Sequence, residues 1–411
     1  MRTAVKAIGL LSVVLTISIV VSANHPVSPD EIGYDAVPGY GIAGGTEILE
    51  WAEKSSSTPG EAPVFKALDP PPGLKIRWLG TAGFEISDDE TTILIDPFVS
   101  RPTVAKAVFK ELPIDTSAVD RYVLGPIERS GGLKKIKAIL ISHTHYDHVQ
   151  DAPYVLAKFQ HTADRPLIVG DRNLVDVLKK YCGKERRIPW LKGIDPLDKS
   201  PRFIIDFNEK QLKPNPPASE RLARPVGQFG NFKITAFISW HGLYDDLSLS
   251  KDLSFTLAGK ITGNPPYKGA DLRAYLNTSM TYLIEYKDQF RIFAVDSPRF
   301  LHSERVSAEI MAGGPIDVLL EGIASRKTDN AIPARITGFH PVYLVPTHFD
   351  NFFIPLDEFK VFDFKIMLFT DNSNLKGFID DYRYAGPKLR MMKMFYYYSM
   401  DHLLHRSSLA N

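Results

Sequence analysis

Three histidines and one aspartate lie within six positions, immediately after the short apolar stretch 136–141. They form the sequence His143-Thr144-His145-Tyr146-Asp147-His148. Such polar side chains are costly to bury without partners, whereas imidazole nitrogens and carboxylate oxygens are preferred ligands of zinc and similar divalent ions. With 11 histidines in 411 residues, the pattern H-x-H-x-D-H should arise by chance in about one chain in two thousand. The cluster therefore predicts a metal site in preference to a histidine-rich surface loop.

Residues of metal-ligand types also follow other apolar stretches that have the character of strands. Strands are predicted at 74–79, 84–86, 91–95, 136–141, 231–239, 280–285, 290–295, 316–320 and 342–345. At or just beyond the ends of four of them lie Asp96, His241, Asp296 and His348. Because α/β folds place their chemistry at the carboxyl ends of strands, we expect these side chains to join the histidine cluster in one site.

Helical spacing of apolar residues appears between the strands. It predicts helices over 149–159, where Pro153 fits in the first turn, and over 174–181. Alternating strands and helices indicate an α/β architecture. The proline-containing stretch 194–228 is predicted to be a surface insertion, and the loop-rich stretch 247–277 a flap over the site.

The first 23 residues have the composition of a signal peptide. Arg2 and Lys6 precede the apolar run 7–20, and 21–23 (Val-Ser-Ala) resembles a cleavage site. We therefore expect an extracytoplasmic protein, periplasmic or secreted. The alternative is an uncleaved anchor, because about 17 apolar residues approach the length that spans a bilayer. Residues 24–73, rich in Pro, Gly, Ser and Glu, are predicted to form an extended arm.

Overall composition excludes some classes of partner and chemistry. The formal net charge is +1, with no basic stripe interleaved with aromatic residues, so a nucleic-acid partner is not expected. Cys182 is the only cysteine and cannot form an internal disulfide. We expect it to be a small buried apolar side chain and not a nucleophile.

The ordered set Asp96, His143-x-His145-x-Asp147-His148, His241, Asp296 and His348 resembles the metallo-β-lactamase superfamily. Within it, the turn 78–84 (Trp-Leu-Gly-Thr-Ala-Gly-Phe) is similar to the branch of ascorbate-6-phosphate lactonase-like proteins and N-acylphosphatidylethanolamine phospholipase D. The resemblance implies an αββα sandwich with one main domain over residues 74–360 and a two-metal site at the sheet edges.

The resemblance also implies a role for each ligand. His143, His145 and His241 would hold the first metal ion. Asp147, His148 and His348 would hold the second, and Asp296 would bridge both. Asp96 would orient a ligand imidazole, and Asp147 could also orient the nucleophile or manage its proton. Zinc is the expected metal, with Mn²⁺ and Fe²⁺ as alternatives.

Two bridged divalent ions predict a hydrolase that attacks with a metal-bound hydroxide. The expected substrate is a small-molecule or lipid ester, in the first place a phosphodiester or phospholipid. The alternatives are a lactonase or carboxylic-ester hydrolase, and an iron-dependent redox enzyme on the same scaffold. Arg299, His302 and Asp350 follow the ligands closely and are candidates for substrate contact or for support of the ligands.

The C-terminal extension, 361–411, is expected to pack on the domain. Its segment 387–398 is basic and rich in Met and Tyr. We predict a helix packed on the core there, with peripheral contact to a membrane as the alternative. The sequence leaves the oligomeric state open.

Overall fold

The computed structural model describes the chain chiefly at residues 72–103, 112–159, 165–170, 223–239, 279–296, 304–323 and 331–350. Shorter described pieces are 35–36, 42–43, 203–204, 352, and parts of 174–178, 378–382 and 387–400. The predicted signal peptide and the 247–277 flap lie outside the described residues.

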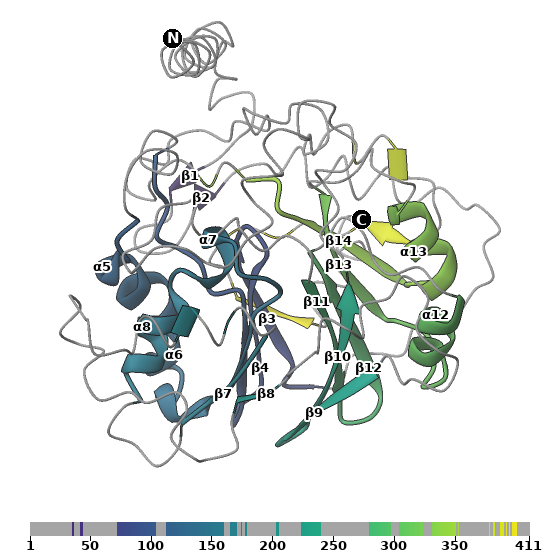
Figure 1. Ribbon diagram of the computed structural model, residues 1–411, viewed down its shortest axis with the longest axis horizontal. Helices are drawn as coiled ribbons and strands as arrows, with labels where there is room; N and C mark the ends of the chain where they lie inside the picture. Colours follow the sequence, from purple (N-terminus) through teal and green to yellow (C-terminus); the bar gives the residue numbers. More distant parts are fainter. Residues whose placement is uncertain are drawn as a thin grey trace, which may run out of the picture.

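Two seven-stranded mixed sheets pack against each other at the centre of the molecule (Figure 1). In the first sheet the order is β16 (Tyr397–Ser399), β3 (Lys75–Gly80), β4 (Gly83–Ser87), β5 (Thr92–Ile95), β6 (Ile136–Leu140), β7 (Leu167–Val169) and β8 (Phe203–Ile204). In the second it is β15 (Lys388–Leu389), β14 (Tyr343–Thr347), β13 (Val318–Gly322), β12 (Phe290–Val295), β11 (Ser279–Tyr286), β10 (Phe232–Ser239) and β9 (Ala223–Phe229). A separate two-stranded pair joins β1 (Asp35–Ala36) and β2 (Ile42–Ala43).

Helices cover the outer face of each sheet (Figure 1). Beside the first sheet lie α5 (Thr116–Ala118), a π-helical turn (Val119–Leu124), α6 (Gly125–Arg129), a 3₁₀ turn (Leu133–Lys135), α7 (Tyr146–Val149) and α8 (Ala152–Ala157). Beside the second lie α12 (Glu304–Met311) and α13 (Ala331–Phe339). The αββα sandwich expected from the resemblance is therefore confirmed.

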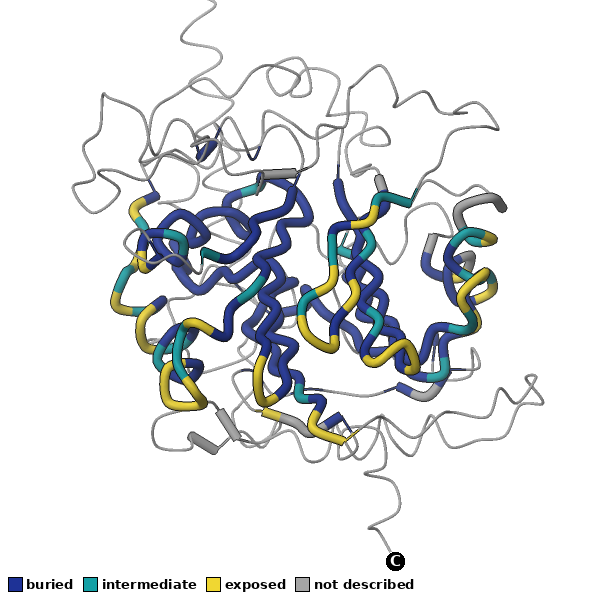
Figure 2. The backbone as a smooth tube through the Cα atoms, turned by 90° about the horizontal axis from the view of Figure 1, so that it is seen from below, coloured by how far each residue is buried: buried dark blue, intermediate teal, exposed yellow. Residues whose placement is uncertain are grey.

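Both sheets contain an antiparallel half and a parallel half. Strands β5 to β8 run parallel in the first sheet, and β12 to β15 run parallel in the second. The parallel strands are almost continuously apolar, as expected for strands buried on both faces, and Figure 2 shows buried backbone through the middle of the molecule with exposed backbone at the helices and hairpins. Since parallel strands end at one edge of a sheet, the residues after β5, β6, β12 and β14 are brought to neighbouring edges.

Two hydrogen bonds join the sheets beside those strand ends. The Tyr282 hydroxyl donates to the Ile141 carbonyl at 2.6 Å, and the Met280 N–H donates to the Ser142 carbonyl, also at 2.6 Å. The start of β11 is thereby fixed to the end of β6, so the edges of the two sheets are held together at the histidine cluster.

Helix α8 has Pro153 in its first turn, as predicted, so the expected helix over 149–159 is confirmed with the shorter bounds Ala152–Ala157. Two other sequence-based predictions need correction. The predicted surface insertion 194–228 overlaps strand β9, an edge strand that tolerates Pro225. The tail segment 387–398 is extended at β15 and at the start of β16, and not helical, because open sheet edges offer hydrogen bonds to both pieces.

None of the helices in the described part of the chain is long and apolar enough to span a membrane.

A buried ion pair fixes α13 to the second sheet. The Arg335 Nε donates to Glu321 Oε2 at 2.7 Å, and a second guanidinium nitrogen pairs with Oε1. Neither side chain is exposed to solvent. Because α13 carries Arg335 and β13 carries Glu321, the pair connects the outer helix layer with the strand between those that lead to Asp296 and His348.

Replacing Arg335 by Met should lower the free energy of unfolding by about 3–5 kcal/mol, because Glu321 would be left buried without its counter-charge. Urea denaturation at pH 7 measures the change. Lys75→Met removes the exposed pair between Lys75 and Asp89 and should change the free energy far less. Equal losses in the two variants would contradict this role for the Arg335–Glu321 pair.

Candidate metal centre

The candidate ligands lie after three strands, and the supporting Asp96 lies after a fourth. His143 follows β6, Asp296 follows β12 and His348 follows β14, while Asp147 and His148 lie on the short helix α7. Asp96 follows β5 and has φ +39°, and His348 has φ +59°. Such left-handed backbone is unfavourable for a residue with a side chain and persists where surrounding contacts impose it. In these loops it turns the chain sharply at the strand end.

The first group of ligand atoms belongs to His143, His148 and Asp296, which offer atoms within 4.8 Å of one another. Asp296 Oδ2 lies 3.6 Å from His143 Nδ1 and 3.4 Å from His148 Nε2. His145 extends the group, since its Nδ1 lies 3.0 Å from His143 Nε2. Imidazole nitrogens and a carboxylate oxygen therefore converge from two loops.

The second group consists of Asp147, His148 and His348, again with atoms within 4.8 Å. Asp147 Oδ2 lies 3.5 Å from His148 Nε2 and 3.4 Å from His348 Nε2. Asp296 Oδ1 lies 3.9 Å from His348 Nε2. The two groups thus meet at His148 and Asp296, and a carboxylate between two groups of imidazoles is suited to bridge two cations.

One oxygen in the centre tests whether the residues fit a metal. Asp296 Oδ1 is buried and accepts no hydrogen bond from any described residue. A buried carboxylate oxygen without a donor is costly, and a divalent ion coordinated to it would remove that cost. The mixed nitrogen and oxygen donor set suits zinc and neighbouring transition metals.

The electrostatic environment also favours a cation. Burial opposes the charged form of His148, but the carboxylates of Asp296, Asp147 and Asp96 outweigh burial and raise its pKa to about 10. Burial likewise opposes the charged form of His348, and Asp296 and Asp147 raise its pKa. For Asp147, burial is outweighed by His148 and His348, which hold the pKa of its carboxyl well below the usual range. The same negative potential that retains protons on the imidazoles would attract a divalent ion.

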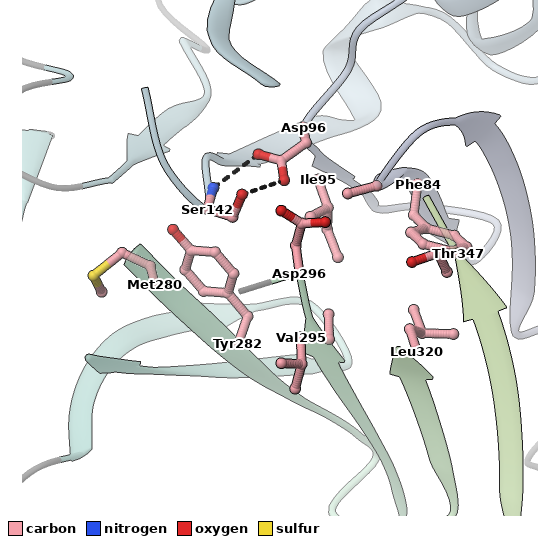
Figure 3. Close-up of a pocket in the computed structure, with 12 residues that line it drawn as sticks. Phe84, Ile95, Asp96, Ser142, Met280, Tyr282, Val295, Asp296, Leu320 and Thr347 are labelled. Atoms are coloured by element: carbon pink, nitrogen blue, oxygen red, sulfur yellow. Dashed lines mark hydrogen bonds between the residues drawn. The ribbon is translucent and has the colours of Figure 1, made fainter. Parts of the chain in front are cut away.

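Asp96 contacts both Ser142, as Figure 3 shows, and the ring of His148. Its Oδ2 lies 2.9 Å from His148 Nδ1 and accepts a 2.5 Å hydrogen bond from the Ser142 hydroxyl, while its Oδ1 accepts from the Ser142 N–H at 2.8 Å. The Ser142 hydroxyl also lies 3.1 Å from His143 Nδ1. Asp96 and Ser142 therefore fix the rings of two candidate ligands.

Behind the carboxylates lies a small pocket between the two sheets. Asp96, Asp296 and Ser142 occupy one end of it in Figure 3, and the Tyr282 hydroxyl points toward Ser142. The remaining wall is mostly apolar and includes Phe84, Ile95, Ala82, Met280, Val295 and Leu320. In such surroundings an electrostatic interaction is stronger than in water.

The structure brings together seven of the predicted site residues: Asp96, His143, His145, Asp147, His148, Asp296 and His348. His241, Arg299 and His302 lie outside the described residues. Asp350 is fully buried and paired with Arg101, so of the two roles considered for it, support fits its position and substrate contact does not. Two residues near the centre, Ser142 and Tyr282, were not predicted from the sequence. The position of Ser142 between a strand and the histidine cluster could have indicated its role, whereas no sequence pattern indicates a role for Tyr282.

Comparisons with known proteins find partial matches to metal-dependent hydrolases. Residues 91–215 match the model of the Beta-lactamase superfamily domain. The chain is 31% identical over 81 residues to a UPF0173 metal-dependent hydrolase of Hyperthermus butylicus, covering 20% of this chain and 26% of that protein. It is 24% identical over 235 residues to a UPF0173 metal-dependent hydrolase of Polynucleobacter asymbioticus, covering 52% and 74%. The chain thus spans only about a quarter of the first relative, 26% of its length.

A solved structure is similar as well. Igni18, described as a novel metallo hydrolase from Ignicoccus hospitalis, aligns with 79% of this chain and 97% of its own at 14% identity and a TM-score of 0.43.

Asp96→Asn should weaken the binding of Zn²⁺ by roughly ten- to a hundredfold, because partners that orient ligand imidazoles typically contribute that much to metal affinity. Competition titration with a chromophoric chelator measures it. Asp88→Asn is the matched control, since Asp88 is also buried but accepts from the N–H groups of Glu90 and Thr91 in a turn. An unchanged affinity in Asp96→Asn would contradict the supporting role.

When zinc binds at pH 7, each protein molecule should release at least about one proton. The pKa of His148 is raised to about 10, and His148 must lose its proton to act as a ligand. The apparent affinity should therefore rise as the pH increases from 7 toward 10. Calorimetric titration in buffers of different ionisation enthalpy measures the number of protons. A binding enthalpy that is the same in every buffer would contradict the prediction.

Proposed function

We propose that the chain is a metal-dependent hydrolase of the metallo-β-lactamase superfamily that uses two divalent ions. The match of residues 91–215 to the model of the Beta-lactamase superfamily domain supports this proposal. His143, His145 and His241 would hold one ion, Asp147, His148 and His348 would hold the other, and Asp296 would contribute to both. Zinc is the proposed metal.

One observation carries the proposal. Two groups of ligand atoms, each within 4.8 Å, meet at His148, and Asp296 lies within 3.4–3.9 Å of imidazole nitrogens from both groups. Among the described residues no donor reaches Asp296 Oδ1, and a metal ion would satisfy this buried oxygen.

The reaction follows from this ligand set. Two bound divalent ions would lower the pKa of a bound water molecule and polarise the carbonyl or phosphoryl oxygen of an ester. Asp147 keeps its negative charge at neutral pH because its pKa is held low, so its carboxylate can orient a water molecule by accepting a hydrogen bond from it. Asp96 holds the ring of His148 through the 2.9 Å contact at Nδ1. No serine or cysteine nucleophile is needed.

The proposed substrate is a phosphodiester, and more narrowly a phospholipid-like one. The support is the resemblance of the turn 78–84 and of the histidine cluster to the branch that contains a phospholipase D. A carboxylic ester or lactone is the competing substrate class, and the test below includes it.

We also propose an extracytoplasmic location. The support is the positively charged start, apolar run and small residues of 1–23. A phospholipid substrate would bring the protein to a membrane surface, and peripheral contact there is part of the proposal.

His145→Ala and Asp296→Ala should each lose at least one of the two metal ions and lower hydrolysis more than about a hundredfold, since ligands contribute more than the outer partners that already account for ten- to a hundredfold. Metal content is measured by mass spectrometry of the purified protein. Activity is measured on a phosphodiester, an N-acylphosphatidylethanolamine, a lactone and a simple carboxylic ester.

His340→Asn is the control, because His340 is exposed at the end of α13 and lies outside both ligand groups. Asparagine tolerates the φ of +45° at this position. Full metal content and activity in His145→Ala and Asp296→Ala would overturn the metal-dependent mechanism. Activity confined to the lactone or carboxylic ester would overturn the phosphodiester proposal alone.

A further inference from the structure

We propose that Arg101 is a positioning residue of the metal centre, which acts through Asp350 to hold the loop that carries His348. The inference rests on the proposed function, because His348 is one of the proposed metal ligands. Arg101 and Asp350 lie 249 positions apart in the sequence.

The backbone of His348 needs to be held. Its φ of +59° is unfavourable for a histidine, yet its Nε2 must stay 3.4 Å from Asp147 Oδ2 to share a cation with it. The His348 N–H donates to the Thr81 carbonyl at 2.9 Å. The position of this ligand therefore depends on the turn between β3 and β4, which contains Thr81.

Asp350 also forms a hydrogen bond with that turn. Its Oδ1 accepts a hydrogen bond from the Thr81 N–H at 2.8 Å, so Thr81 is bound on one side by His348 and on the other by Asp350. Thr81 itself has φ +50°. Thr81 and His348, which both have left-handed backbone, are therefore hydrogen-bonded to each other. The Asp350 carboxylate holds Thr81 and, through it, His348.

Arg101 completes the arrangement from a third segment. Its guanidinium pairs with Asp350 Oδ2, and neither side chain is exposed. Arg101 belongs to the loop that begins at Asp96, and this loop is fixed by Asp151 Oδ2, which accepts from the Val99 and Ser100 N–H groups at 2.7 and 2.9 Å. The contact therefore connects the loop after β5 with the loop after β14, one from each sheet.

Neighbouring residues pack closely around the pair. Gly80 has φ +96°, and a Cβ at this position would collide with the Arg101 guanidinium and come within 3.1 Å of Asp350 Oδ2. Met394 in the C-terminal tail also packs there, with its Sδ 3.4 Å from the same guanidinium nitrogen. Arg101 is thus fixed where it can hold Asp350.

A second buried pair, within the first sheet, provides a matched control. Arg77 pairs with Glu85, and the two side chains are 0% and 1% exposed. They lie on β3 and β4 and are absent from both groups of candidate ligands. Loss of either pair should reduce stability, but only loss of the Arg101–Asp350 pair should disturb His348.

The experiment is a titration of the metal-free full chain with Co²⁺, followed by visible absorption, with thermal unfolding recorded for every variant. The wild type should bind two ions. The double variant Arg101→Met/Asp350→Leu replaces the pair by apolar side chains, so it leaves no buried charge unpaired and should fold. It should bind the first ion normally and the second roughly ten- to a hundredfold more weakly.

The single variant Arg101→Lys retains the positive charge, so it should bind the second Co²⁺ ion almost as tightly as the wild type does. Arg77→Met/Glu85→Leu should bind both ions as the wild type does. Two unchanged affinities in a folded Arg101→Met/Asp350→Leu variant would overturn the inference, and so would an equal weakening in the control pair. A wild type that binds no Co²⁺ would instead overturn the proposed function, so the two failures are distinguishable.

Discussion

His148 is surrounded by three buried carboxylates, and the rest of the site depends on this arrangement. Its Nδ1 lies 2.9 Å from Asp96, and its Nε2 lies 3.5 Å from Asp147 and 3.4 Å from Asp296. So much buried negative charge in one place is stable only with positive charge among it. Protons on imidazoles supply that charge in the protein alone, and divalent ions would supply it more effectively.

The sandwich fold makes this concentration of charge possible. Asp96 and the histidine cluster come from the first sheet, whereas Asp296 and His348 come from the second. Each follows a strand that is almost wholly buried, so the strand ends are closely packed even where the loops adopt left-handed backbone. Hydrogen bonds between Tyr282 and Ile141, and between Met280 and Ser142, hold the edges of the two sheets next to each other.

Local patterns in the sequence predicted the strands and a metal site at the histidine cluster, and the family resemblance predicted the sandwich, which the structure confirms. The spacing of the histidines and Asp147 is encoded in six consecutive residues, and the apolar strands before Asp96, Asp296 and His348 are evident from composition alone. Contacts between distant residues carry no such signal. The Arg101–Asp350 pair is one case, and the tail strands β15 and β16 are another, because a two- or three-residue strand is determined by the sheet edge that it completes and not by its own sequence.

The most direct measurement is anomalous X-ray scattering from crystals of the zinc-loaded protein, recorded on both sides of the zinc absorption edge. Two peaks about 3.5–4 Å apart are expected, one beside His143 and His145 and the other between Asp147, His148 and His348, with Asp296 in contact with both. The absence of peaks among these side chains, or zinc bound only elsewhere on the protein, would contradict a two-metal centre at this edge of the sandwich.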